Sequence, residues 1–373
     1  MTSFAKIALG IWLLAAGYFA FLGVTTTPSE GDSLAYHLPI AGMVAEGKWF
    51  DKQEFVASIF YYPAMGETLV AVMMRLGLPL NLYNWLGWVL WTGVAYMLAR
   101  RSGLPKKSAV ILAAAAAMWP TVVRLINNQT VDIWLAVWWG AALLKLTKKA
   151  RKLGDWIWLG IYLGMMAGTK YSGVLFAGGL LLVFRKDWWK SGWRKNLYWI
   201  IPAVVIGGFW YVRNWLLVGN PVYPETTLLW QGDPGFNLMI WKPWMVFLKY
   251  PGLFISVFVS EYLLWNLLLP LPLVARNRWV VLGFMNLGIF LFFLPSWPVN
   301  IVSCLRYTFV AFLPLLIAGW QWMREKGREE KIAVAAVLCM AAELTQLDYR
   351  PKIFVLLIFF ATAVVLLSQK KYE

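Results

Sequence analysis

The chain has 373 residues, of which 61% are hydrophobic and 14% are charged, and its mean hydropathy is +0.62. Soluble domains carry about 25% charged residues, so this composition excludes an ordinary water-soluble protein. The formal net charge of +16 can indicate a nucleic-acid partner, but the lysines and arginines cluster in short loops between apolar segments. That pattern favours a membrane protein and no nucleic-acid partner. Two cysteines and one histidine exclude a disulfide framework and a multi-histidine metal site.

Long, unbroken apolar runs such as Ile7–Val24 and Ile353–Leu367 predict membrane-spanning helices rather than the short alternating strands of a barrel. No small-residue cleavage site follows the first run, which we therefore interpret as a span and not as a cleavable signal. The fold class expected is all-α, a polytopic membrane protein forming a single domain over residues 1–373. About twelve spans are predicted, at roughly residues 4–24, 80–99, 108–123, 131–147, 156–168, 172–184, 197–217, 251–274, 279–295, 307–323, 331–347 and 353–368.

The charges predict an orientation for these spans. With a cytoplasmic N-terminus, most of the 34 lysines and arginines fall in cytoplasmic loops, as the positive-inside rule requires, and both termini are cytoplasmic. The two long loops, at about 25–78 and 218–250, then lie on the non-cytoplasmic side, where we expect the functional site. A prokaryotic plasma membrane is the expected location, with membrane lipids as surroundings.

The first long loop has a structure of its own. Glu30 and Asp32 form an acid-x-acid pair directly before residues 34–49, whose apolar positions fall on one helical row. This pattern predicts an interfacial helix that lies in the membrane surface rather than crossing it. Asp32 stands at its start, where an N-cap role is one interpretation and a role in chemistry is the other.

Further polar motifs recur at the predicted outer ends of the spans. They are Tyr36-His37-Leu38-Pro39, Tyr61-Tyr62-Pro63 with Glu67, the run Asn127–Asp132, Gly168–Tyr171, Arg213-Asn214, Gly219–Pro224, and Leu305-Arg306-Tyr307 followed by Pro314. With this order along the chain and this placement on the outer side, the motifs resemble those of the GT-C superfamily of integral-membrane glycosyltransferases. The similarity is to its protein-mannosyltransferase and aminoarabinose-transferase-like branch. The likeness covers roughly residues 1–320.

The resemblance implies a function and a site. The chain would be an inverting glycosyltransferase that takes a sugar from a polyprenyl-phosphate donor on the non-cytoplasmic face. Such an enzyme needs a carboxylate to take the acceptor's proton and cations to hold the departing phosphate. The implied catalytic acids are Asp32, Glu30 and Asp132, and Asp32 and Asp132 would also suit a divalent ion such as Mg²⁺ or Mn²⁺. The implied substrate-binding residues are Tyr36, His37, Tyr62, Glu67, Lys170, Tyr171, Arg213, Tyr223, Arg306 and Tyr307.

Alternatives stay open at this stage. Lys170, Arg213 and Arg306 lie near predicted helix ends, where snorkelling to the headgroups is an equal explanation. His37 fits a packed interfacial histidine as well as a site residue. A secondary transporter or flippase of a lipid-linked or anionic solute is the main rival function, although it tends to show paired interrupted helices. A polymerase or ligase of lipid-linked glycans would share most of these features. The sequence leaves open the sugar and whether the acceptor is a glycan, a lipid or a protein.

Overall fold

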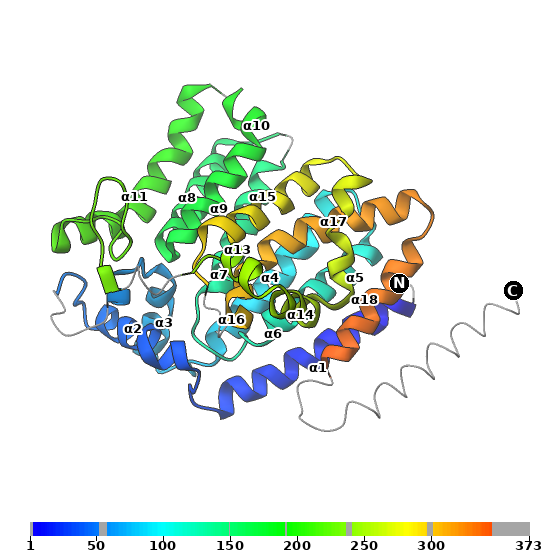
Figure 1. Ribbon diagram of the computed structural model, residues 1–373, viewed down its shortest axis with the longest axis horizontal. Helices are drawn as coiled ribbons and strands as arrows, with labels where there is room; N and C mark the ends of the chain where they lie inside the picture. Colours follow the sequence, from blue (N-terminus) through cyan, green and yellow to red (C-terminus); the bar gives the residue numbers. More distant parts are fainter. Residues whose placement is uncertain are drawn as a thin grey trace, which may run out of the picture.

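The computed structural model describes residues 3–51, 58–148, 150–190, 192–235, 241–296 and 301–344, and these form a helical bundle (Figure 1). The helices, including short π and 3-10 turns labelled η, are α1 (Ser3–Thr25), η1 (Ser33–His37), α2 (Leu38–Ala45), η2 (Ser58–Tyr61), α3 (Met65–Arg75), α4 (Leu82–Arg101), α5 (Lys106–Ala117), α6 (Pro120–Val123), α7 (Asp132–Leu146), α8 (Leu153–Thr169), α9 (Tyr171–Val183), α10 (Arg185–Trp189), α11 (Trp193–Val218), α13 (Pro243–Lys249), α14 (Pro251–Tyr262), η3 (Leu263–Leu268), η4 (Leu271–Leu273), α15 (Arg278–Phe293), α16 (Ile301–Cys304), η6 (Leu305–Tyr307), α17 (Phe309–Glu325) and α18 (Glu329–Leu344).

The helices confirm the predicted all-α membrane fold. Each predicted span as far as the one at 331–347 overlaps one or more helices, whereas the one predicted at 353–368 lies outside the described residues. By length and apolar composition, three helices within the described part qualify as membrane spans: Ser3–Thr25, Trp193–Val218 and Pro251–Leu273. The bent pair of Ile301–Tyr307 and Phe309–Glu325 makes a fourth if it counts as one span. The total of about twelve therefore stays a prediction.

One predicted span is interrupted. The apolar run predicted to span 108–123 ends as α5 at Ala117, and α6 begins afresh at Pro120. Proline fixes its own φ and lacks an N–H, so it suits the first turn of a helix and breaks an ongoing one. The helix therefore stops at Ala117, and the chain passes through the buried α6 into a largely buried polar turn before α7.

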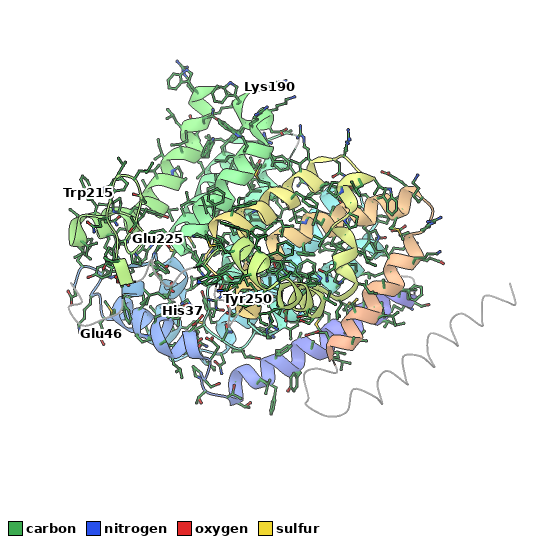
Figure 2. The ribbon with its side chains drawn as sticks, in the orientation of Figure 1. His37, Glu46, Lys190, Trp215, Glu225 and Tyr250 are labelled. Atoms are coloured by element: carbon green, nitrogen blue, oxygen red, sulfur yellow. The ribbon has the colours of Figure 1, made fainter. Side chains whose placement is uncertain are left out.

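The two long loops meet at one end of the molecule. The predicted interfacial helix is present as η1 and α2, ending at Ala45, and it packs against α3. Figure 1 shows α2 and α3 beside the segment that follows α11, and the rings of Tyr61 and Tyr223 lie 5.1 Å apart. The other end of α11 is marked by Lys190, far from His37 and Glu225 in Figure 2. The turn between α10 and α11, which carries Lys190, and the two long loops thus lie at opposite ends of α11.

Helices α8 and α11 approach closely because small residues line their contact. A Cβ added at Gly160 would lie 2.1 Å from the Trp199 carbonyl oxygen, and one at Gly207 would lie 3.0 Å from the Gly164 carbonyl oxygen. Small residues at four-residue spacing allow this backbone approach in membranes, where apolar burial gives little drive for helix association. The α8–α11 pair holds the Lys170 and Arg213 ends of these helices together.

We expect Gly160→Ala to lower the stability of the protein by about 1–3 kcal/mol, because the new methyl group must displace backbone. Gly178→Ala is the matched control: it is also a helical glycine, in α9, but no atom lies within 4 Å of its added Cβ. That change should be neutral or stabilising by up to about 1 kcal/mol. Unfolding in detergent, followed by circular dichroism, measures both, and equal effects would contradict the close packing.

Candidate active site

Four charged residues meet where the long loops join the bundle. Arg306 Nη1 donates a hydrogen bond to Asp32 Oδ2 at 2.8 Å, and Arg306 Nε lies 3.4 Å from Asp132 Oδ2. Lys170 Nζ donates to Asp132 Oδ1 at 3.1 Å and to the Tyr307 hydroxyl at 3.0 Å. We call Asp32, Asp132, Lys170 and Arg306 the ionic cluster. It balances two carboxylates against two cations.

Each member of the ionic cluster stands at the end of a helix. Asp32 opens the surface helix, Asp132 is the first residue of α7, and Lys170 is the single extended residue between α8 and α9. Arg306 lies in η6, next to the 62° bend before α17. Helix ends leave backbone groups unpaired, so charged side chains and chain reversals gather there. The motifs predicted from the sequence are therefore brought into one site.

The two acids of the first loop have different roles. Asp32 occupies the N-cap position of η1 but makes no capping hydrogen bond with its side chain. Glu30 does so instead: its carboxylate accepts from the Asp32 and Ser33 backbone N–H groups, at 3.1 and 2.7 Å, and from the Ser33 hydroxyl at 2.8 Å. Glu30 thus caps the surface helix and Asp32 faces Arg306, and the catalytic role of each acid stays a prediction.

His37 and Glu67 form a second, fully buried pair. His37 Nδ1 lies 2.6 Å from Glu67 Oε1, and the Tyr83 hydroxyl donates to the neighbouring Gly66 carbonyl. The His37 ring lies against the Tyr36 ring, with centroids 4.2 Å apart. This pair ties the surface helix to α3. His37 thus has the packed environment that one interpretation of the sequence foresaw, directly beside the ionic cluster.

Tyrosines form the wall between the cluster and the second loop. The Tyr171 hydroxyl donates to the Tyr223 carbonyl oxygen at 2.6 Å and accepts from Asn214 Nδ2 at 3.0 Å. The Tyr62 and Tyr171 rings meet edge to face, 5.2 Å apart. Arg213 donates to the Tyr61 carbonyl oxygen and to Asn214 Oδ1, at 2.9 and 2.7 Å. Arg213 is thus engaged with backbone and amide groups, not with a carboxylate.

Polar residues of the run Asn127–Asp132, together with Asn84, which sequence reasoning overlooked, support the site. Asn84 Nδ2 donates to Asn128 Oδ1 and to the Thr130 carbonyl oxygen, at 2.9 and 2.7 Å. The Gln129 backbone N–H donates to Ser33 Oγ at 3.0 Å. All of these side chains are buried. These hydrogen bonds fix the turn before Asp132 and join it to the start of the surface helix. In the sequence, the feature that indicates this turn is a run of polar residues inside an apolar stretch.

The environment sets the protonation of the first-loop groups. Burial alone would raise the pKa of the Asp32 carboxyl, but the Arg306 guanidinium outweighs it and lowers that pKa. Burial raises the pKa of the Tyr36 and Tyr62 hydroxyls well above the usual value. Asp32 is therefore ionised, and the two phenols are neutral groups able to donate hydrogen bonds.

The acids do not fit a divalent cation in this arrangement. A guanidinium stands between Asp32 and Asp132, and Glu30 is turned away to cap the helix. Across the part of the chain that the structure describes, no three histidine, cysteine or acidic side chains come together as a ligand set. Hard cations need several oxygen ligands around them, whereas here Asp32 Oδ2 and Asp132 Oδ2 both face the Arg306 guanidinium.

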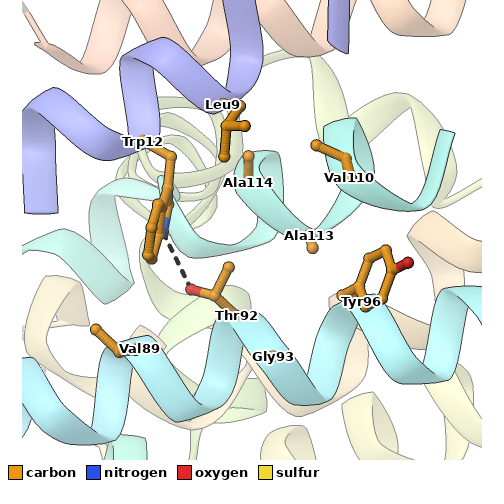
Figure 3. Close-up of a pocket in the computed structure, with 9 residues that line it drawn as sticks. All are labelled: Leu9, Trp12, Val89, Thr92, Gly93, Tyr96, Val110, Ala113 and Ala114. Carbon is orange, nitrogen blue, oxygen red and sulfur yellow. Dashed lines mark hydrogen bonds between the residues drawn. The ribbon is translucent and has the colours of Figure 1, made fainter. Parts of the chain in front are cut away.

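A separate apolar cavity of about 260 Å³ opens between α1, α4 and α5 (Figure 3). Its lining is Leu9, Trp12, Val89, Thr92, Gly93, Tyr96, Val110, Ala113 and Ala114. Trp12 Nε1 donates to the Thr92 hydroxyl at 3.2 Å along its edge. None of the described residues that line this cavity is charged.

Glu30→Ala should lower the stability by about 1 kcal/mol, because it leaves the first N–H groups of the surface helix without their acceptor. Glu30→Gln keeps one carbonyl acceptor and should cost less. Glu46→Ala, at the exposed end of the same helix, is the control and should change stability by no more than about 0.5 kcal/mol. Unfolding in detergent ranks the three variants, and an equal loss in Glu30→Ala and Glu46→Ala would remove the capping role.

Comparison with known proteins agrees with the motifs. Residues 61–213, less than half of the chain, match the family model of dolichyl-phosphate-mannose-protein mannosyltransferase. This segment contains Asp132 and Lys170. No curated protein matches the sequence.

Two solved structures share the fold. The crystal structure of ArnT from Cupriavidus metallidurans bound to undecaprenyl phosphate has a TM-score of 0.61 and 19% identity, covering 97% of this chain and 68% of that one. The apo structure of ArnT from the same organism has a TM-score of 0.60 and 18% identity over the same shares. At these identities the likeness is one of fold. The chain therefore has the fold of these two structures, and residues 61–213 resemble a mannosyltransferase family model.

Proposed function

We propose that the protein is an inverting glycosyltransferase that moves a sugar from a polyprenyl-phosphate carrier to an acceptor at the non-cytoplasmic membrane face. The observation that carries this proposal is the ionic cluster, in which a partly exposed carboxylate, Asp32, lies beside two cations at the end of a membrane bundle. Base and phosphate ligands are the two kinds of group that this transfer needs.

The donor would bind through its phosphate. Lys170 and Arg306 offer N–H donors suited to anionic oxygens, while the polyprenyl tail stays in the bilayer beside the bundle. The neutral hydroxyls and ring faces of Tyr36, Tyr62 and Tyr171 lie around the cluster and offer hydrogen bonds and apolar contact to a sugar. Support for the carrier comes from the ArnT structure of the same fold, which is bound to undecaprenyl phosphate.

The transfer is a single displacement. An acceptor hydroxyl oxygen attacks the anomeric carbon on the face opposite the phosphate. The bond from that carbon to the phosphate oxygen breaks, and its electron pair leaves with polyprenyl phosphate. The acceptor's proton goes to the Asp32 carboxylate, and the configuration at the anomeric carbon inverts. Lys170 and Arg306 stabilise the charge that develops on the leaving phosphate, and Asp132 orients both cations.

The proposed side of the membrane follows from charge. The turn around Lys190 is basic and lies at the opposite end of α11 from the two long loops. The positive-inside rule puts such turns in the cytoplasm, which leaves the ionic cluster outside and both termini inside, in a plasma membrane. The acceptor is a glycan, a lipid or a protein available on that face.

The decisive experiment measures release of free polyprenyl phosphate from a panel of carrier-linked sugars, with purified full-length protein and a native lipid extract as acceptor source. Wild type should release it from one donor. Asp32→Asn should lower the rate by roughly 10²–10⁴-fold, because the base is lost while the size is kept. Glu46→Gln, an exposed acid on the same surface helix, is the control and should keep the wild-type rate.

Each result has a clear meaning. Release by wild type that is lost in a folded Asp32→Asn variant establishes the transferase and names its sugar. If no donor releases polyprenyl phosphate, the transferase proposal fails and the transporter or flippase takes its place. Undiminished release by Asp32→Asn keeps the enzyme and removes Asp32 as its base.

A further inference from the structure

The ionic cluster contains a conflict between its resting contacts and its proposed work. In the proposed function Arg306 binds the carrier phosphate, but its guanidinium already contacts both Asp32 and Asp132. In the proposed function Asp32 acts as a base, but its carboxylate accepts a charge-assisted hydrogen bond from Arg306. Hydrogen bonds between charged groups are stronger than those between neutral groups. While the pair is closed, Asp32 Oδ2 and Arg306 Nη1 are engaged with each other rather than with an acceptor or a phosphate.

The geometry singles out which contact can open. Asp132 is 2% exposed and is held by Lys170 as well as by Arg306. The side chain of Asp32 is 39% exposed, and a single hydrogen bond to Arg306 Nη1 is its one ion-pair contact among the described residues. Water can replace that contact on the Asp32 side, so the Asp32–Arg306 pair costs least to separate.

Arg306 also has unused hydrogen-bonding capacity. Its Nε is buried and finds no hydrogen-bond acceptor among the described residues, because the approach to Asp132 Oδ2 at 3.4 Å is not a hydrogen bond. Asp132 Oδ2 is likewise buried without a donor. A buried guanidinium N–H without an acceptor is costly, and an anionic oxygen arriving in the cluster would satisfy it.

We propose that Arg306 exchanges partners when the donor binds: it leaves Asp32 for the carrier phosphate, and this release frees the Asp32 carboxylate to act as base. The inference rests on the proposed function and deepens it. Arg306 is then a positioning residue for Asp32 in the empty site and a phosphate ligand in the filled one. The base becomes available only when a donor is present.

The exchange changes the strength of the base. In the empty site, burial would raise the pKa of Asp32, but the Arg306 guanidinium lowers it overall, with lesser help from His37 and Lys170. A carboxylate of low pKa is a weak base. When Arg306 turns to a phosphate, its lowering effect diminishes and a negative charge arrives, so the pKa of Asp32 rises. The other groups that face it, Tyr36 and Asp132, are a neutral phenol and an anion, and they add no cation.

A double-mutant cycle on carrier binding tests the exchange without any turnover. The probe is undecaprenyl phosphate, titrated onto purified full-length wild type, Asp32→Asn, Arg306→Gln and the double variant. Asp32→Asn should bind the probe about tenfold more tightly than wild type, because Arg306 no longer has to leave a carboxylate. Arg306→Gln should bind it more weakly. In the Arg306→Gln background, Asp32→Asn should change the affinity by less than about twofold.

The control separates exchange from general repulsion between Asp32 and a phosphate. Undecaprenol, which has the tail and no phosphate, should bind all four proteins equally. Tightening by Asp32→Asn that persists at full size in the Arg306→Gln background would mean direct repulsion and would overturn the exchange, as would no tightening at all. Unfolding in detergent checks each variant, and Arg306→Met, which also removes the charge, replaces Arg306→Gln if the latter does not fold.

A pH profile gives an independent readout on the active wild type. The acid limb of kcat/KM reports the free enzyme, and that of kcat reports the donor complex. Exchange predicts that the limb of kcat lies at higher pH than the limb of kcat/KM, since protonation of Asp32 becomes easier once Arg306 has left. Coinciding limbs would contradict it. If no carrier-linked sugar releases polyprenyl phosphate, the transferase proposal is wrong. If the double-mutant cycle shows no coupling between Asp32 and Arg306, only the exchange is wrong.

Discussion

The ionic cluster is the interaction on which the rest of the site depends. It joins residues as far apart in sequence as Asp32 and Arg306, and in doing so it fixes the start of α7, the turn between α8 and α9 and the bend before α17. Charges in a poorly solvated place are tolerated only when they are paired. Loss of one partner would leave the others uncompensated, so the four charges hold these helix ends together as one unit.

The two long loops are attached to the same helix ends. The Tyr61 carbonyl oxygen accepts from both Arg213 and Asn214, and Tyr171, the residue after Lys170, donates to the Tyr223 carbonyl oxygen. Each loop is therefore held by a side chain of the bundle acting on loop backbone. This arrangement places the tyrosines of both loops and of α9 next to the cluster.

The sequence was informative where a property is local. Apolar length located the spans because crossing hydrocarbon depends on length and composition alone, and the motifs supplied all four members of the ionic cluster. Pairing could not be predicted, since nothing local joins Asp32 to Arg306 or tells Glu30, the cap, from Asp32. The break at Trp119-Pro120 was readable from proline chemistry and was overlooked. Asn84 belongs to no motif, and only the fold reveals that it and Gln129 support the turn before Asp132.

The balance of the cluster gives one reason for its composition. A site built to hold a phosphate needs buried cations, and without a ligand those cations would be unpaired and destabilising. Asp32 and Asp132 supply the missing charge in the empty protein. In the proposed exchange the more buried of the two, Asp132, stays with Lys170, and a ligand displaces the more exposed, Asp32. On that proposal, the carboxylate that stabilises the empty site becomes free in the filled site to accept a proton. Stability and chemistry thus use one set of charges in two arrangements.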